Sequence, residues 1–410
     1  AAAGHGSVHF IGVGTPQRAR GHAADTSYVE AAVDALVPHL RGDHLIVGKS
    51  TVPVGTATAL ARRIDTLTAP DSAVALAWNP EFLREGFAVE DTLRPDRLVM
   101  GTDPDSDSSH ALETLREVYR DIINTGLPVI ETDWSTAELV KVSANAFLAT
   151  KISFINAISE LCEIVGADVS TLADAIGHDK RIGRRFLNAG LGFGGGCLPK
   201  DIRAFEARAE ELGAHGALRF LREVDTINMR RRSAMVDLIV GSCPRELLGA
   251  NVAVLGAAFK PESDDVRDSP ALSVAGQLAL RGASVTVFDP KANSNSQRMY
   301  PMLAYADSAA EAAQDADVVA IATEWAEFVH MAPAELDPVV RSRVIVDGRR
   351  CLDPLTWTRA GWTYAALGGR TAASADDLAL QNETAGGRRH TGAAHASAAS
   401  FEGATQVAHR

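Results

Sequence analysis

Cysteine is scarce in this sequence, and its spacing excludes two common uses of it. The chain of 410 residues contains four cysteines, Cys162, Cys197, Cys243 and Cys351, which lie far apart and form no CxxC pair. This arrangement argues against a zinc site and against a disulfide framework, because both need cysteines at characteristic spacings. We therefore expect no bound metal and a cytoplasmic protein that works in the reducing cytosol.

Long apolar runs and a net positive charge are also lacking. No apolar run approaches the roughly 18 residues that a membrane helix needs, so we expect no membrane association. The 40 Lys and Arg residues against 52 Asp and Glu give a net charge of −12, and so acidic a chain is a poor partner for nucleic acid. The chain is long enough for two or three domains, and 46% hydrophobic and 22% charged residues are typical of a globular protein.

Short apolar stretches that each end in a polar turn recur in the first third of the chain. They are SVHFIGVGTPQ, HLIVGKSTVPVGT and AVALAWNPEFLREG, and they alternate with helical segments such as TSYVEAAVDALVPHL. Strands that alternate with helices predict a parallel α/β sheet. Ligands of such sheets bind beyond the carboxyl ends of the strands, which is where the GTP, STVP and NPEF turns lie.

From Ser135 the pattern becomes purely helical. Ser135 and Glu138 have the spacing of a capping box, and the helix is predicted to continue to Gly166, about 30 residues against a mean of about 11 to 12. A second set of strands follows in NVAVLGAAFK, SVTVFDP, DVVAIATEW and SRVIVDGRR. We predict an α/β protein of two Rossmann-like, doubly wound parallel-sheet lobes joined by a long central helix. The predicted segments are 1–132 (first lobe), 133–240 (helical domain), 241–370 (second lobe) and 371–410 (disordered tail).

One cysteine stands in an unusual setting, the stretch NAGLGFGGGCLPKDIRAF at residues 188–205. Glycines crowd around Cys197, and Lys200 and Asp201 begin what the pattern predicts to be a helix. A thiolate is a strong nucleophile, positive charge or helix N-terminal amides lower its pKa, and glycines let a substrate come close. The alternative is a buried, inert cysteine beside a flexible turn. The flanking glycines and the Lys-Asp pair favour the nucleophile.

GFGGGCLPKD resembles the active-site motif of the UDP-glucose and GDP-mannose dehydrogenase family. Further segments resemble the family in the same order, among them VGTP, KSTVPVGT, NPEFLREG, PDRLVMG, KVSANAFLATKISFINAISE, RIGRRFLNAGLGFGGGC, GAAFKPESDDVRDSP, ATEW and DGRR. The resemblance implies an NAD-binding first lobe, a central domain that forms a homodimer and carries the cysteine loop, and a second lobe that binds a UDP-sugar.

The resemblance implies a four-electron oxidation of a nucleotide-sugar primary alcohol, UDP-glucose to UDP-glucuronate, with NAD accepting two hydrides. Cys197 would capture the aldehyde as a thiohemiacetal, which is oxidised to a thioester and hydrolysed. Lys141 and Asn145 lie four residues apart on one helix face, and Lys141 would stabilise the oxyanion. Either Glu81 or Asp201 would activate the hydrolytic water, with the help of Thr51. The implied catalytic residues are Cys197, Lys141, Asn145, Glu81, Asp201 and Thr51.

Binding residues follow from the same motifs. Arg181 resembles an arginine that the family donates across the dimer interface, and the loop from Asn188 to Gly194 would wrap the sugar nucleotide. The implied substrate contacts are Glu81, Phe82, Leu83, Arg84, Glu85, Lys141, Asn145, Arg181, Asn188, Leu191, Gly192, Phe193, Gly194, Phe259, Lys260 and Arg349. The implied NAD contacts are Val13, Gly14, Thr15, Pro16, Gln17, Ser50, Thr51, Val52, Glu85 and Arg267.

One family feature is missing from the sequence. Residues 1–30 contain no GxGxxG turn of the kind that holds the NAD pyrophosphate at a helix N-terminus. We therefore expect a truncated first lobe that lacks about two βα units, on the order of seventy residues. Three functions remain open: a UDP-glucose 6-dehydrogenase, which NPEFLREG and KISFINAISE favour, a GDP-mannose 6-dehydrogenase, or a truncated, NAD-incompetent protein that binds a sugar nucleotide without turnover.

Overall fold

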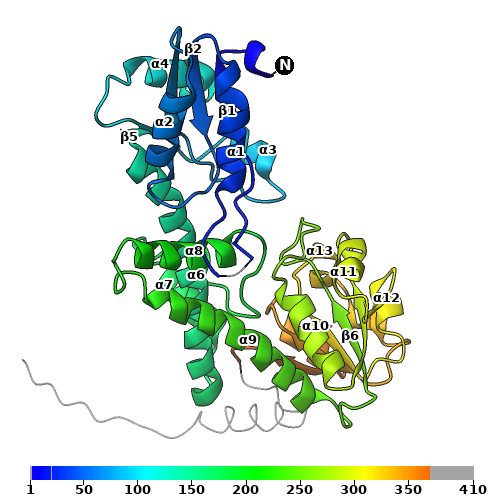
Figure 1. Cartoon of the computed structure of the whole chain (residues 1–410). Helices are drawn as coiled ribbons and strands as arrows, with labels where there is room; N and C mark the ends of the chain where they lie inside the picture. Colours follow the sequence, from blue (N-terminus) through cyan, green and yellow to red (C-terminus); the bar gives the residue numbers. More distant parts are fainter. Residues whose placement is uncertain (1, 20, 370–410) are drawn as a thin grey trace, which may run out of the picture. The chain divides into compact units, whose positions relative to one another are not determined.

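The computed structural model describes residues 2–19 and 21–369, so the predicted tail at 371–410 lies outside the described residues (Figure 1). The first lobe contains a five-stranded sheet in the order β1-β2-β3-β4-β5. Its strands are β1 (Val8–Ile11), β2 (Gly42–Gly48), β3 (Ser72–Trp78), β4 (Leu98–Thr102) and β5 (Val129–Asp133). Its helices are η1 (Ala2–Gly4), α1 (Ser27–Leu36), η2 (Val37–His39), α2 (Thr56–Leu67), α3 (Ala88–Leu93), α4 (Ser109–Val118) and α5 (Arg120–Ile123).

This first sheet differs from the prediction in two ways. β1, β2 and β3 pair in parallel, and so do β4 and β5, but β3 and β4 pair antiparallel at Trp78 and Gly101. The strands also follow one another in chain order, so the described strands contain none of the reversal that defines a doubly wound sheet. The expected truncation gains no support from this lobe, because five strands form one sheet whose core includes α1, α2 and part of α6.

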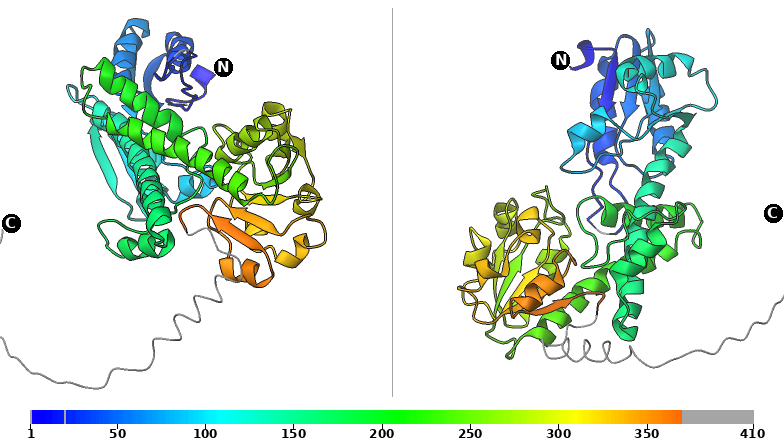
Figure 2. Two further views of the ribbon diagram at one scale, coloured as in Figure 1. Left: turned by 90° about the horizontal axis from the view of Figure 1, so that it is seen from below. Right: turned by 180° about the vertical axis from the view of Figure 1, so that it is seen from behind.

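Helix α6 (Trp134–Val165) is the long central helix that the sequence predicts, and it continues without a break through 32 residues (Figure 2). Its N-cap is Asp133, whose side chain accepts the backbone N–H of Thr136, so the predicted capping box at Ser135 is wrong. The carboxylate of Glu138 bonds elsewhere, to backbone N–H groups at the start of α2. α6 packs against all three later helices of the central domain. The other helices here are α7 (Val169–Gly177), α8 (Leu198–Glu211) and α9 (Phe220–Ser242).

The second lobe is the doubly wound sheet that the sequence predicts. Its order is β11-β10-β9-β6-β7-β8 and all its pairs are parallel. The strands are added on one side of β6 as far as β8 and then on its other side from β9, so the strand order reverses at β6. The strands are β6 (Asn251–Leu255), β7 (Ser284–Phe288), β8 (Ala304–Tyr305), β9 (Val318–Ile321), β10 (Val344–Asp347) and β11 (Thr363–Ala366). The helices are α10 (Pro270–Leu280), α11 (Asn293–Met299), α12 (Ala309–Ala312), α13 (Ala326–Val329), α14 (Pro333–Leu336) and α15 (Pro354–Arg359).

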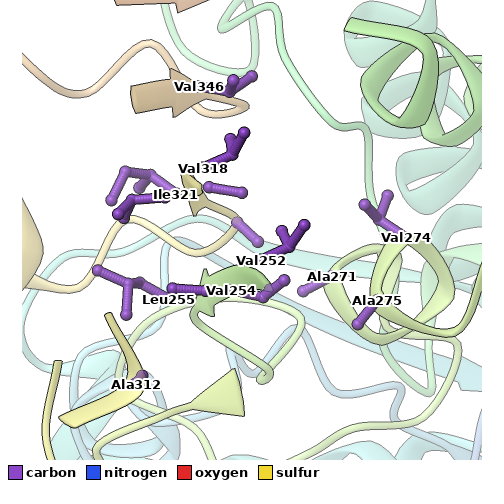
Figure 3. Close-up of a cluster of buried hydrophobic side chains, with 14 of the residues drawn as sticks. Val252, Val254, Leu255, Ala271, Val274, Ala275, Ala312, Val318, Ile321 and Val346 are labelled. Carbon is purple, nitrogen blue, oxygen red and sulfur yellow. The ribbon is translucent and has the colours of Figure 1, made fainter. Parts of the chain in front are cut away.

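The core of the second lobe explains why its strands are so uniformly apolar. Val252, Val254 and Leu255 of β6 are almost completely buried, with side chains on both faces of the sheet (Figure 3). On one face Ala271 and Val274 of α10 pack onto them. A parallel sheet covered on both faces needs such continuous apolar runs. Among residues 2–19 and 21–369, no helix combines the length and the apolar character needed to cross a membrane.

Candidate active site

Cys197 lies where the sequence predicts it, immediately before a helix. It is the N-cap residue of α8, and Pro199 in the first turn fits a position that needs no backbone N–H. Gly195, two residues earlier, has φ +84°, and a Cβ there would lie 2.8 Å from the ring of Phe259. A glycine is therefore required both by the left-handed backbone and by the close approach of the second lobe. The crowding of glycines around the thiol is a packing requirement.

Four predicted catalytic residues come together from three segments of the chain. Lys141 on α6 is buried, and its Nζ lies 3.1 Å from Oε1 of Glu81, in the loop after β3. Asn145, one turn along α6, donates from Nδ2 to Oδ2 of Asp201 at 2.6 Å. Asp201 is buried in the first turn of α8, and Lys200 Nζ lies 2.7 Å from its other oxygen. The arrangement places two lysines and two carboxylates around the start of α8.

Neighbouring groups shift the pKa of the Cys197 thiol in opposite directions. Cys197 is exposed, but the chain around it removes part of its hydration, and this desolvation is the largest effect that raises the pKa of its thiol. The charge of Asp201 raises this pKa further. Lys141 and Lys200 oppose both and lower the pKa of the thiol. Because these effects together raise the pKa of the thiol, Cys197 needs a proton acceptor when it attacks.

The glycine-rich loop before Cys197 is held by a residue that the sequence analysis missed. Asn228 on α9 is buried, accepts the backbone N–H of Phe193 at 2.8 Å and donates to its carbonyl at 2.9 Å. A Cβ on Gly192, which has φ +86°, would overlap the side-chain oxygen of Asn228. The signal was available: Asn228 follows Leu221 and Val224 at the spacing of the buried face of α9.

Arg349 closes the other side of this loop. It follows β10 and is largely buried, with Nη1 donating to the carbonyl of Gly192 and Nε to that of Ala322, both at 2.8 Å. It borders a cavity of about 290 Å³ that is also lined by Asn188 and Gly190 from the loop and by Arg350. Ligand cavities commonly reach this volume, with a few polar groups that orient the ligand. The structure thus brings together the predicted residues Asn188, Gly192 and Arg349.

Phe259 and Lys260, from the loop after β6, meet the segment that follows β3. Lys260 Nζ donates to the backbone carbonyl of Glu85, and the hydroxyl of Ser263 donates to the Glu85 carboxylate. Lys260 Nζ also lies 5.7 Å from the centre of the Phe259 ring. Burial lowers the pKa of Lys260, and the charge of Glu85 opposes this shift. Glu85 is therefore positioned by the second lobe, although it belongs to the first.

Three predicted arginines are paired with neighbouring acidic residues. Arg181 binds Asp179, Arg84 binds Asp91 and Arg267 binds Asp265, with shortest N–O distances of 2.6 to 2.7 Å. The side chain of Arg181 is 89% exposed, and those of Arg84 and Arg267 are more than half exposed. Because the arginine of each pair is exposed, its ion pair contributes little free energy, and the arginine can leave it to bind another anion. The predicted roles of these arginines remain predictions. The remaining substrate-contact residues from the sequence are the half-buried Phe82, the exposed Leu83 and the buried Leu191, Phe193 and Gly194.

The residues predicted to contact NAD join the ends of β1 and β2. The hydroxyl of Thr15 donates to the carbonyl of Thr51 at 2.6 Å, and that of Ser50 donates to the carbonyl of Val13 at 2.7 Å. Gln17 forms an isolated antiparallel bridge with Ala24. The other members of this set are the exposed Gly14 and Pro16 and the buried Val52. Within the described part of the chain, no group of three or more His, Cys, Asp or Glu side chains is arranged to hold a metal ion.

Comparison with known families gives three matches in chain order. The models of the UDP-glucose/GDP-mannose dehydrogenase family match residues 1–123 (NAD binding domain), 135–230 (central domain) and 253–354 (UDP binding domain). The NAD binding domain model matches from residue 1, so this match does not support the expectation of a truncated first lobe.

Similar proteins of known sequence or structure cover most of the chain. A UDP-glucose 6-dehydrogenase of Rhizobium meliloti is 41% identical over 361 residues, which cover 88% of this chain and 82% of that protein. One of Rickettsia conorii is 42% identical over 363 residues, covering 88% and 81%. The solved structure of a UDP-glucose dehydrogenase from Pyrobaculum islandicum superimposes with a TM-score of 0.78 at 37% identity, covering 88% of this chain and 80% of that one.

Proposed function

The chain belongs to the UDP-glucose/GDP-mannose dehydrogenase family, and from this premise we propose that it oxidises UDP-glucose to UDP-glucuronate with NAD. The observation that carries the proposal is the position of Cys197 at the N-terminus of α8, beside the charges of Lys141 and Asp201. A nucleophile in that setting can hold an aldehyde covalently, so that it is oxidised again before it escapes.

Four residues of the site, Cys197, Lys141, Glu81 and Asp201, have a place in the proposed sequence of steps. The substrate alcohol loses a hydride and a proton, and the sulfur of Cys197 adds to the aldehyde to form a thiohemiacetal. Lys141 stabilises the oxygen that becomes negative, because its ammonium is buried and already placed. A second hydride loss gives the thioester, which water cleaves to the carboxylate. Glu81 and Asp201 are the two carboxylates that can take the proton of that water.

The first lobe offers a place for NAD at the carboxyl ends of its strands. Gly12 and Gly14 after β1 are exposed, and a Cβ on either would meet nothing within 4 Å, so the backbone there is open to a ligand. The hydroxyl of Thr15 donates to the carbonyl of Thr51 and that of Ser50 to the carbonyl of Val13, so these bonds hold the loop after β1 against the loop after β2. These residues fit a dinucleotide at this edge of the sheet. NAD, when bound, supplies the acceptor for the hydride lost in each oxidation.

The sugar nucleotide is proposed to bind at the cavity beside Arg349. Arg349 and Arg350 bring positive charge to it, which suits a diphosphate, and the Asn188–Gly194 loop presents backbone groups. The relatives at 41 and 42% identity are named UDP-glucose 6-dehydrogenases, which supports UDP-glucose as the substrate. GDP-mannose is the alternative that the experiment below tests.

We also propose that the central domain, residues 133–240 between lobes 1–132 and 241–370, forms a homodimer. Phe147, Phe154 and Leu161 repeat every seven residues along α6 and are 66, 51 and 57% exposed. Side chains at this spacing lie along one side of a helix, and an apolar stripe of this kind marks an interaction surface. A second copy of the same helix would cover it symmetrically.

The test compares the chain with its Cys197→Ser variant. We expect UDP-glucose with NAD to yield UDP-glucuronate with the wild type and none with Cys197→Ser, while both bind UDP-glucose with similar affinity by calorimetry. Normal turnover in the variant would exclude Cys197 as the nucleophile. UDP-glucose should also raise the melting temperature of the wild type, as mass action requires for a ligand of the folded state. A larger rise with GDP-mannose would assign the chain to the other branch of the family.

A further inference from the structure

Lys49, a residue without a role in the proposed reaction, lies in a closed hydrogen-bonded network. It follows β2 directly, and its Nζ donates to Oδ1 of Asn79 at 2.8 Å and to the hydroxyl of Tyr119 at 3.2 Å. Tyr119 in turn donates to the same oxygen of Asn79 at 2.6 Å. The rings of Phe10 and Tyr119 lie 6.0 and 5.7 Å from the ammonium. The lysine thus joins the ends of β2, β3 and α4.

Asn79 is the fixed point of this network. It is fully buried, its Nδ2 donates to the carbonyl of Val99, and its backbone N–H donates to that of Gly48, both at 2.8 Å. Two residues later comes Glu81, whose carboxylate meets Lys141 and also accepts the backbone N–H of Leu83. The turn that carries Glu81 therefore starts from an asparagine that Lys49 helps to hold.

The charge of Lys49 is costly where it lies. Burial lowers the pKa of Lys49 to about 8, against the opposing effect of the Glu81 carboxylate. Tyr119, the titratable group that faces it from the end of α4, has its pKa raised to about 12 by burial and stays neutral. Asn79 already accepts a hydrogen bond from Tyr119, so an apolar side chain in place of Lys49 would leave no buried acceptor unpaired. A half-buried cation that the packing does not need, beside the carboxylate proposed to act in the reaction, points to function.

We propose that Lys49 is a positioning residue for the oxidation: through Asn79 and by its charge, it fixes the turn on which Glu81 meets Lys141. The inference rests on the proposed function, because it gives Lys49 a role through the carboxylate proposed to act in that reaction. It predicts that the cationic form supports full activity. The sugar-nucleotide cavity beside Arg349 lies on other segments, so we expect the loss of Lys49 to change the binding of UDP-glucose less than it changes kcat.

The test measures kcat and KM for UDP-glucose between pH 6.5 and 9.5 in the wild type, Lys49→Met, Lys49→Arg and, as a control, Lys291→Met, which removes an exposed lysine. At pH 7 we expect kcat of Lys49→Met to fall about tenfold, the scale of one lost hydrogen bond to a charged group. KM should stay within about twofold. The ratio of the kcat of the wild type to that of Lys49→Met should approach one above pH 9, where Lys49 of the wild type is neutral. Lys49→Arg, always charged, should retain its kcat there.

The outcomes separate the two proposals. A ratio that does not change with pH, or an unchanged kcat in Lys49→Met at pH 7, would overturn the positioning role while leaving the proposed function intact. A wild type that does not oxidise UDP-glucose at all would overturn the proposed function and this inference together. Should Lys49→Met not fold, the comparison of Lys49→Arg with the wild type above pH 8 still decides, because equal declines in kcat would contradict the role of the charge.

Discussion

The side-chain amide of Asn145 donates a 2.6 Å hydrogen bond to Asp201, and this contact joins the two helices that carry the chemistry. Asn145 lies on α6, one turn after Lys141, and Asp201 lies in the first turn of the helix that Cys197 caps. Both partners are buried. The distance between the lysine and the thiol is therefore set in part by one neutral donor and one carboxylate.

Asn145→Asp should break this link, because it places a second carboxylate against Asp201. Two like charges at hydrogen-bond distance repel, and the buried oxygens lose their donor, at a cost of about 1 to 3 kcal/mol. We expect a lower melting temperature at pH 8, a smaller difference near pH 4, where carboxylates become protonated, and a loss of UDP-glucose oxidation. Asn124→Asp, at an exposed position, is the control. Equal melting temperatures of Asn145→Asp and the wild type at pH 8 would show that the Asn145–Asp201 hydrogen bond does not stabilise the fold.

Gly192→Ala should disturb the loop before Cys197 without touching the thiol. The added Cβ would overlap Asn228, and φ +86° is unfavourable for alanine, with a typical cost of about 1 to 3 kcal/mol. Because Asn228 holds Phe193, we expect a raised KM for UDP-glucose and a lower melting temperature. Gly216→Ala, at an exposed position where a Cβ meets nothing within 4 Å, should change neither. A normal KM for UDP-glucose in Gly192→Ala would show that this loop does not contribute to substrate binding.

Local patterns predicted those parts of the fold and the site that depend on nearby residues. The start of α8 after Cys197 and the uninterrupted α6 follow from helical periodicity, and the parallel second sheet follows from strands without polar positions. The N-cap of α6 was misplaced by two residues, because Asp133 and Ser135 are both good caps and the bond to Thr136 decided between them.

Long-range pairings were the part that the sequence could not supply. The antiparallel contact of β3 with β4 leaves no mark on the hydrophobic pattern, since both strands are apolar. The motifs placed Glu81 and Lys141 in one site by resemblance, and the structure adds their 3.1 Å contact. The sequence indicates that Asn228 lies on the buried face of α9, but not that it binds Phe193, and it does not indicate that Lys49 binds Asn79. Both partners are more than 25 positions away along the chain.

Phe154→Glu should dissociate the proposed dimer. The side chain is 51% exposed at the middle of the apolar stripe on α6, so the variant would bury a carboxylate in the proposed dimer interface. We expect light scattering to give twice the monomer mass for the wild type and the monomer mass for the variant at micromolar concentration. Glu113→Gln, on the exposed surface of α4, is the matched control for a charge change. A monomeric wild type would remove the proposal that this stripe pairs two copies.

Glu138 makes stability depend on pH in a direction that is unusual for a carboxylate. It is buried on α6, and its two oxygens accept the backbone N–H groups of Gly55 and Ala57 at 2.7 Å each, at the start of α2. Burial raises its pKa from 4.5 to about 7, although the backbone bonds and Arg208 act against this shift. The folded state therefore binds the proton more tightly than the unfolded state does.

This residue's contribution to the free energy of unfolding should be full below pH 4.5 and lost as pH rises through 7. Glu138→Gln keeps the shape but cannot titrate. The stability of the wild type minus that of Glu138→Gln should therefore fall between pH 4.5 and 7, by up to about 3 kcal/mol. Urea unfolding across this range measures the difference, with Glu113→Gln as the exposed control. A difference that rises with pH would mean that the two N–H donors outweigh desolvation and that the ionised carboxylate is the form that caps α2.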